Sequence, residues 1–135
     1  MVIVEGTIKG KARPRVCKGT AFTPRDTIEY ENWVKINYKQ QDGKYLNGPI
    51  KAKIIAYYKI PKSYSKKRVQ AIRSGLDLPL KRPDIDNCIK IILDSLNGIA
   101  YKDDSQIVEL AGLKRWTEEE ERVEIGLEEI NNEKY

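Results

Sequence analysis

Residues 82–98 read RPDIDNCIKIILDSLNG, a stretch that predicts an amphipathic helix with carboxylates at its start. Apolar residues recur at the spacing of one helical face, and Gly98 is the expected stop. These apolar residues are Ile85, Ile89, Ile92, Leu93 and Leu96. The opposite face carries Asp86, Lys90, Asp94 and Asn97. We therefore expect a helix with one buried side and one charged side.

A second acidic pair, Asp103-Asp104, follows this helix. From Asp86 to Asn97 a helix rises roughly 17 Å, and the chain from Gly98 to Asp104 can return about 20 Å. We therefore expect Asp104 beside Asp84 and Asp86. Close carboxylates repel by up to about 4 kcal/mol per pair at a protein surface unless a cation lies between them. Mg²⁺, with Mn²⁺ as a substitute, prefers such oxygen ligands.

Each part of this pattern also has a simpler interpretation. Asp84 and Asp86 alone would be helix caps, and Asp103-Asp104 alone would be a turn. Lys90 lies one turn beyond Asp86. Its ammonium can form a surface ion pair, or it can bind a scissile phosphate. The length of the helix allows the two acidic pairs to meet. The two pairs at this spacing are therefore a more specific signal for a metal site than either pair alone.

Basic residues flank the acidic motif in a chain of 135 residues with a formal net charge of +5. Residues 1–25 and 51–83 are strongly basic, whereas the tail from Trp116 is acidic. Such segments are either solvated charge or contacts for a polyanion such as nucleic acid. The candidates for DNA contact are Lys11, Arg13, Arg15, Lys66, Lys67, Arg68 and Arg82.

The chain has no histidine and only two cysteines, Cys17 and Cys88. This composition disfavours structural zinc and any nucleophile activated by a histidine base. Cys88 falls within the predicted helix, where a small buried side chain is expected. No charge-free apolar run approaches 18 residues and no signal peptide is recognised, so no membrane association and a cytoplasmic location are expected.

Other patterns predict the remaining elements. Residues 2–8 predict a strand and residues 9–22 a loop. Thr23 and Pro24 then cap a helix to about Gln40, with Tyr30, Trp33 and Val34 on its buried side. Residues 50–58 alternate as a strand, and Ser65 caps a short helix over 66–74. Residues 106–115 and 122–130 predict a hairpin. Trp33 and Trp116 are interpreted as packing residues.

Several blocks of the chain together resemble the RusA family of Holliday-junction resolvases. The core blocks are residues 81–87, Lys90, residues 94–98 and residues 101–107. The upstream residues 13–15, 23–24 and 61–67 resemble the Gram-positive and prophage-type members. The resemblance and the predicted elements imply one compact α+β domain over residues 1–135, with a mixed sheet of about four strands packed against two or three helices.

The resemblance also implies a function. Such proteins are homodimeric endonucleases that cut four-way DNA junctions by paired symmetric nicks with Mg²⁺ or Mn²⁺. The family's catalytic, metal-binding carboxylates correspond to Asp84, Asp86 and Asp104, and its lysine to Lys90; Asp103 matches a position that is commonly acidic. A metal-activated water is the expected nucleophile, and a bacterial or prophage origin is expected.

Two other classes of protein remain open on the sequence. The first is a non-catalytic, structure-selective DNA-binding module. The second is a metal-dependent nucleotide phosphohydrolase, although the chain has no glycine-rich phosphate loop of the Walker type. Cleavage of branched DNA in the presence of a divalent cation would distinguish a nuclease from both.

Overall fold

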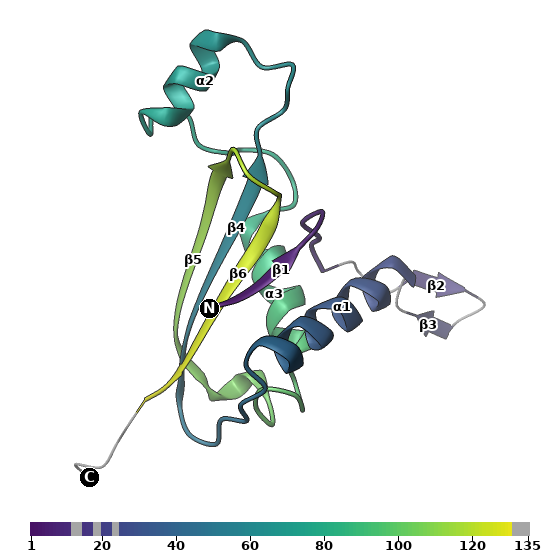
Figure 1. The fold of residues 1–135 in the computed structure, drawn as a ribbon. Helices are drawn as coiled ribbons and strands as arrows, with labels where there is room; N and C mark the ends of the chain where they lie inside the picture. The colour runs from purple at the N-terminus through teal and green to yellow at the C-terminus, as the bar shows by residue number, and fades with distance from the viewer. Residues whose placement is uncertain (12–14, 18–19, 23–24, 131–135) are drawn as a thin grey trace.

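The computed structural model describes residues 1–11, 15–17, 20–22 and 25–130. It contains a four-stranded sheet with two helices against one face (Figure 1). The strands of this sheet are β1 (Val2–Glu5), β4 (Ile50–Lys59), β5 (Ile107–Thr117) and β6 (Arg122–Glu129). Their order is β1-β6-β4-β5, with β5 parallel to β4 and the other pairs antiparallel. The helices of the described residues are α1 (Arg25–Gln41), α2 (Lys66–Arg73) and α3 (Ile85–Ser95). The predicted α+β class with a mixed sheet is confirmed.

Strand β4 lies inside the sheet because it is apolar along most of its length. The side chains of Ile50, Ala52, Ile54, Ala56 and Tyr58 are all buried beneath the helices. A buried strand of this kind is most stable when it is paired on both edges, since its backbone N–H and C=O groups are then fully hydrogen-bonded inside the core.

The predicted hairpin between β5 and β6 is wrong, because both strands pair with β4 and not with each other. The connection, residues 118–121, crosses the end of β4. Two strand spacings are about 10 Å, and four extended residues reach about 13 Å, so this short link is sufficient. Alternation of apolar and polar residues predicts where strands occur, but it does not specify which strands pair with each other.

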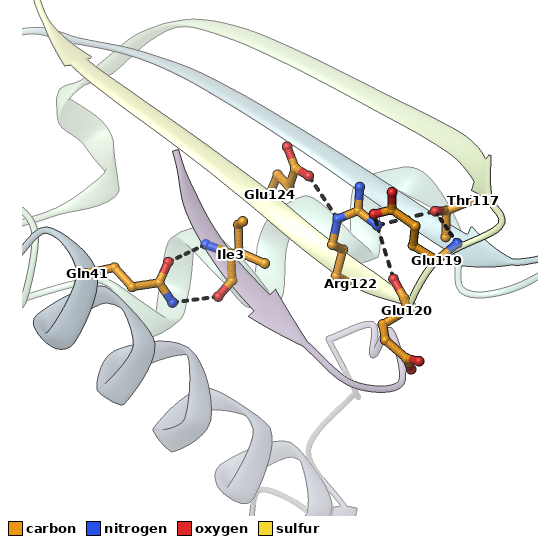
Figure 2. A network of polar contacts seen from close by, with 7 residues as sticks. All are labelled: Ile3, Gln41, Thr117, Glu119, Glu120, Arg122 and Glu124. Carbon is orange, nitrogen blue, oxygen red and sulfur yellow. Dashed lines mark hydrogen bonds and ion pairs between the residues drawn. The ribbon is translucent and has the colours of Figure 1, made fainter.

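The crossing is held by two charged side chains. The carboxylate of Glu121 accepts hydrogen bonds from the backbone N–H of Lys59 at 3.1 Å and of Ile8 at 3.2 Å. The guanidinium of Arg122 donates to Glu124 at 2.8 Å and to the Thr117 hydroxyl at 3.3 Å (Figure 2). The link is thereby tied to the end of β4 and to both of its own strands.

The outer edge of β1 is closed by a side chain of α1. Gln41 accepts a hydrogen bond from the Ile3 N–H and donates one to the Ile3 carbonyl, both at 2.7 Å (Figure 2). The amide therefore satisfies backbone groups that an exposed edge strand would otherwise offer to another chain. The same contact fixes the end of α1 against the sheet.

The buried faces of the helices differ in part from the predicted ones. On α3, Cys88, Ile91 and Ile92 are buried as part of the core, whereas Ile85 is 38% exposed. The buried role of Cys88 is confirmed. On α1, Trp33 is 44% exposed, with its indole N–H donating to the Glu5 carbonyl at 2.7 Å. The prediction that Trp33 lies on the buried side is wrong, because its indole is hydrogen-bonded to the exposed end of β1 and not packed in the core.

Helix α2 lies beyond the end of β4 and contributes no buried residue (Figure 1). Ser65 caps it as predicted, by accepting a hydrogen bond from the Arg68 N–H. Arg73 donates to Glu118 at 2.8 Å, which links the helix to the β5–β6 connection. Trp116 packs against the core and meets Tyr64 edge to face, as the packing interpretation predicts.

The N-terminal third differs most from the expectations. The strand predicted over residues 2–8 ends at Glu5. The segment predicted as a loop contains two short antiparallel strands, β2 (Arg15–Cys17) and β3 (Thr20–Phe22). The predicted cap at Thr23 and Pro24 lies outside the described residues. No helix in the described ranges has the length and apolar character needed to cross a membrane.

Candidate active site

The candidate site lies along the exposed face of α3, and the start of this helix is fixed by its neighbours. The Tyr58 hydroxyl donates to the Pro83 carbonyl at 3.0 Å, and the Lys11 N–H donates to the Asn87 carbonyl at 3.1 Å. A Cβ atom on Gly10 would lie 2.9 Å from the Pro83 Cβ and 3.1 Å from the Asn87 Cβ. The segment before β2 can therefore approach this turn only because residue 10 is glycine.

Asp84 occupies the N-cap position of α3, but its carboxylate makes no capping hydrogen bond within the described residues. Its backbone is extended, with φ −64° and ψ 150°. Asp86 lies in the first helical turn, and both side chains are exposed. The simple capping interpretation therefore does not account for the Asp84 carboxylate, which remains available to a ligand.

Lys90 and Asp94 continue the same polar face of α3. The Lys90 ammonium lies 3.5 Å from Asp94 Oδ2, so the surface ion pair considered from the sequence is formed. The Lys90 side chain is 60% exposed, and an ion pair of this kind contributes little to stability. Its ammonium can therefore also reach a phosphate without a large energetic cost.

The chain folds back tightly after α3 and so brings the second acidic pair to the end of the helix. Gly98 has φ 77°, and its N–H donates to the Tyr101 carbonyl at 2.7 Å. The buried Tyr101 hydroxyl donates to the Leu93 carbonyl at 2.6 Å. Asn97 Oδ1 then accepts the Asp104 N–H at 2.9 Å.

Asp103 and Asp104 have different roles in this turn. Asp103 caps the short 3₁₀ helix Asp104–Gln106, accepting the Ser105 N–H at 3.0 Å while the Gln106 side chain accepts its own N–H. Hydrogen bonds from Ser105 lower the pKa of the Asp103 carboxyl below its usual value. The turn interpretation therefore holds for Asp103, and the Asp104 carboxylate is not used by the cap.

Asp104 lies in the less favourable electrostatic environment of the two. Partial burial, followed by the charges of Asp103 and Asp94, raises the pKa of the Asp104 carboxyl, and Lys90 opposes this rise. Asp94 and Asp104 are therefore like-charged neighbours. A neighbouring cation would relieve this like-charge contact.

The structure thus places Asp104 with Asp94 near the end of α3, Asp84 with Asp86 at its start, and Lys90 midway between Asp86 and Asp94. Within the described ranges, no three acidic, cysteine or histidine side chains are close enough together to hold one metal ion. The chemistry of Asp84, Asp86 and Asp104 suits Mg²⁺ or Mn²⁺, because all are exposed or half-buried carboxylates. The expected three-aspartate ligand set stays a prediction.

Three residues that the sequence analysis did not assign to the site belong to this surface. Asp94 contacts Lys90 and also Lys11, Asn97 holds Asp104, and Glu31 of α1 contacts Lys11. The position of Asp94 four residues after Lys90 was a usable signal. Glu31 had no such signal, because it reaches the site only through tertiary packing.

The predicted DNA contacts have different surroundings. Lys66 and Lys67 are exposed on α2, and Arg82 is exposed just before α3. Arg68 already donates to Asp77 at 3.1 Å and lies over the Tyr64 ring. Lys11 is held by two carboxylates. The side chains of Arg13 and Arg15 lie outside the described residues.

Comparisons with known proteins identify the family of this chain. Residues 5–128 match the family model of endodeoxyribonuclease RusA, so the chain belongs to the RusA family. An uncharacterized protein, YqaN of Bacillus subtilis (strain 168), is 39% identical over 88 residues. This match covers 64% of the present chain and 61% of YqaN, so the chain spans less than two thirds of that relative.

Proposed function

We propose that this protein is a divalent-metal-dependent endonuclease that resolves four-way DNA junctions. The main support is the family match over residues 5–128, a span within which the expected site residues Asp84, Asp86, Lys90 and Asp104 all fall. The exposure of α3's polar face agrees with a large substrate such as DNA, which cannot enter a closed cavity.

In this proposal, Asp84, Asp86 and Asp104 would together hold Mg²⁺ or Mn²⁺, which requires the three carboxylates to come closer together than they are among the described residues of the structure. When bound, the ion would polarise the scissile phosphate and lower the pKa of a nearby water. The Lys90 ammonium binds a phosphate oxygen and stabilises the negative charge that develops on it. Asn97 keeps Asp104 in place through the backbone N–H that it accepts.

The proposed working unit is a homodimer. A four-way junction has two equivalent strands to cut, and the proposed site occurs once per chain. A two-fold dimer presents two such sites in a symmetric arrangement, so that paired nicks separate the junction into two duplexes.

Cleavage assays on labelled DNA test the proposal. Four-way junctions, linear duplex and single strands of the same sequence are incubated with the protein, with and without Mg²⁺. We expect cleavage of the four-way junction only when Mg²⁺ is present, and no hydrolysis of mononucleotides. Cleavage that persists in a chelator would contradict the metal requirement, and mononucleotide hydrolysis alone would favour the phosphohydrolase.

A non-catalytic junction-binding protein is the second candidate. It is favoured by one observation, namely that among the described residues no three acidic side chains are close enough together to hold one metal ion. Specific junction binding with no cleavage in Mg²⁺ or Mn²⁺ would support this alternative.

A further inference from the structure

The ammonium of Lys11 lies between carboxylates from two different helices. Its Nζ is 3.0 Å from Glu31 Oε2 of α1 and 3.5 Å from Asp94 Oδ2 of α3. The three side chains are only 23%, 17% and 21% exposed, respectively. By contrast, the Lys90 side chain is 60% exposed. Lys11 is therefore a partly buried cation that is held between two carboxylates.

The backbone of Lys11 is attached to the same helix as its side chain. Its N–H donates to the Asn87 carbonyl, and the preceding Gly10 packs against Pro83 and Asn87. From Asn87 to Asp94 the helix rises about 10 Å. Because both its backbone and its ammonium are held, Lys11 is already engaged within the protein at both ends of the residue.

Asp94 connects Lys11 to the proposed active site. The same oxygen, Asp94 Oδ2, lies 3.5 Å from the Lys90 ammonium. The charge of the Asp94 carboxylate also acts on the neighbouring Asp104 carboxyl group. Whatever fixes the position of Asp94 therefore influences both of these residues.

We propose that Lys11 is a positioning residue of the active site and not a phosphate contact. It joins Asp94 to Glu31, and thereby sets the positions of Lys90 and Asp104. Without Lys11, the Asp94 carboxylate would draw the Lys90 ammonium toward itself and away from the substrate. The inference about cleavage rests on the proposed function.

The test compares Lys11→Met with Lys9→Met, which removes the same charge from an exposed position in the same segment. Turnover of a four-way junction gives kcat, and junction binding in Ca²⁺ at several salt concentrations gives the slope of log K against log salt. For Lys11→Met we expect kcat to fall about tenfold or more, since small misplacements of catalytic groups are costly, with no change in the salt slope. Lys9→Met should leave kcat unchanged.

Two further variants identify the contact that is responsible. Glu31→Gln should also lower kcat, and adding it to Lys11→Met should produce no further loss, because both act through one contact. Lys11→Arg should retain part of the activity. An unchanged kcat in Lys11→Met would overturn the proposal. A slope of log K against log salt that is flatter by about 0.9 in Lys11→Met would also overturn it, because that change would identify a phosphate contact.

Thermal unfolding separates this inference from the proposed function. If the wild-type protein cuts no branched DNA, the proposed function fails, but the Lys11–Glu31 contact can still be measured. We then expect the Tm decreases of Lys11→Met and Glu31→Gln to be non-additive in the double variant. Fully additive decreases would show that the two residues do not act together, which would contradict the inference.

Discussion

Asp103 and Asp104 are adjacent in the chain, yet only Asp103 is used to hold the turn. Hydrogen bonds from Ser105 lower the Asp103 pKa from its usual 3.8. A group with a lowered folded-state pKa stabilises the fold above its unfolded pKa, and this contribution is lost as the pH falls through the folded value. Asp103→Ala should therefore lower the Tm by a few degrees at pH 7, and the difference from wild type should shrink below pH 3.8.

The matched control for this prediction is Asp103→Asn. Asparagine can still accept the Ser105 N–H, so the turn is kept, but its side chain does not titrate. Its Tm should lie between those of the wild type and Asp103→Ala at pH 7. A Tm difference between wild type and Asp103→Ala that stays constant from pH 7 to pH 3 would contradict the proposed role of the charge.

The three proposed metal ligands should respond differently from Asp103. Asp84→Asn, Asp86→Asn and Asp104→Asn should each reduce junction cleavage to background, because each removes a carboxylate ligand with little change in volume. Junction binding measured by gel shift should stay near wild type. Asp103→Asn should lose much less activity. Near-normal cleavage by one of the first three variants would remove that residue from the proposed ligand set.

At the scale of the secondary-structure elements, the crossing over the end of β4 depends on Glu121. Its carboxylate accepts the N–H groups of Lys59 and Ile8, which would lose these partners in Glu121→Ala. We expect that variant to lose about 1–3 kcal/mol in urea unfolding, and these two amides to exchange faster. Glu120→Ala is the control, because that side chain is 75% exposed and its ion pair with Lys59 is long, at 3.7 Å. Equal losses in both variants would contradict a specific role for Glu121.

Local sequence patterns correctly predicted the helices and strands that depend on residue spacing or capping within one segment. The apolar spacing of α3, the Ser65 cap of α2 and the alternation of β4 are all present in the structure. The order of the strands was not predictable in this way. Strands β5 and β6 are consecutive and look like a hairpin, but the apolar strand β4 takes the place between them.

The candidate site was predictable to a similar extent. The sequence identified the exposed acidic residues and Lys90 on one helix face, since these depend on helical spacing. It did not predict that the turn after Gly98 would bring Asp104 to Asp94, or that Glu31 would reach Lys11. Both contacts depend on how α1 and the returning chain pack on α3.

At the scale of the whole molecule, affinity for DNA should come mainly from neutralised phosphates. Exposed Lys66 and Lys67 on α2, together with Arg13 and Arg15, are the proposed contacts. The slope of log K against log salt should become flatter by about 0.9 for each of these residues replaced by alanine. An unchanged slope in the fourfold variant would place the DNA on another part of the surface.

The central claim is that two active sites of a dimer cut one junction in a paired reaction. The most direct measurement uses a supercoiled plasmid that extrudes a cruciform, incubated with the protein and Mg²⁺. Two nicks made while the protein stays bound convert supercoiled plasmid directly to the linear form, and this is the predicted result. Accumulation of nicked circles would contradict paired cleavage, and plasmid that stays supercoiled although the protein binds the cruciform would contradict the nuclease itself.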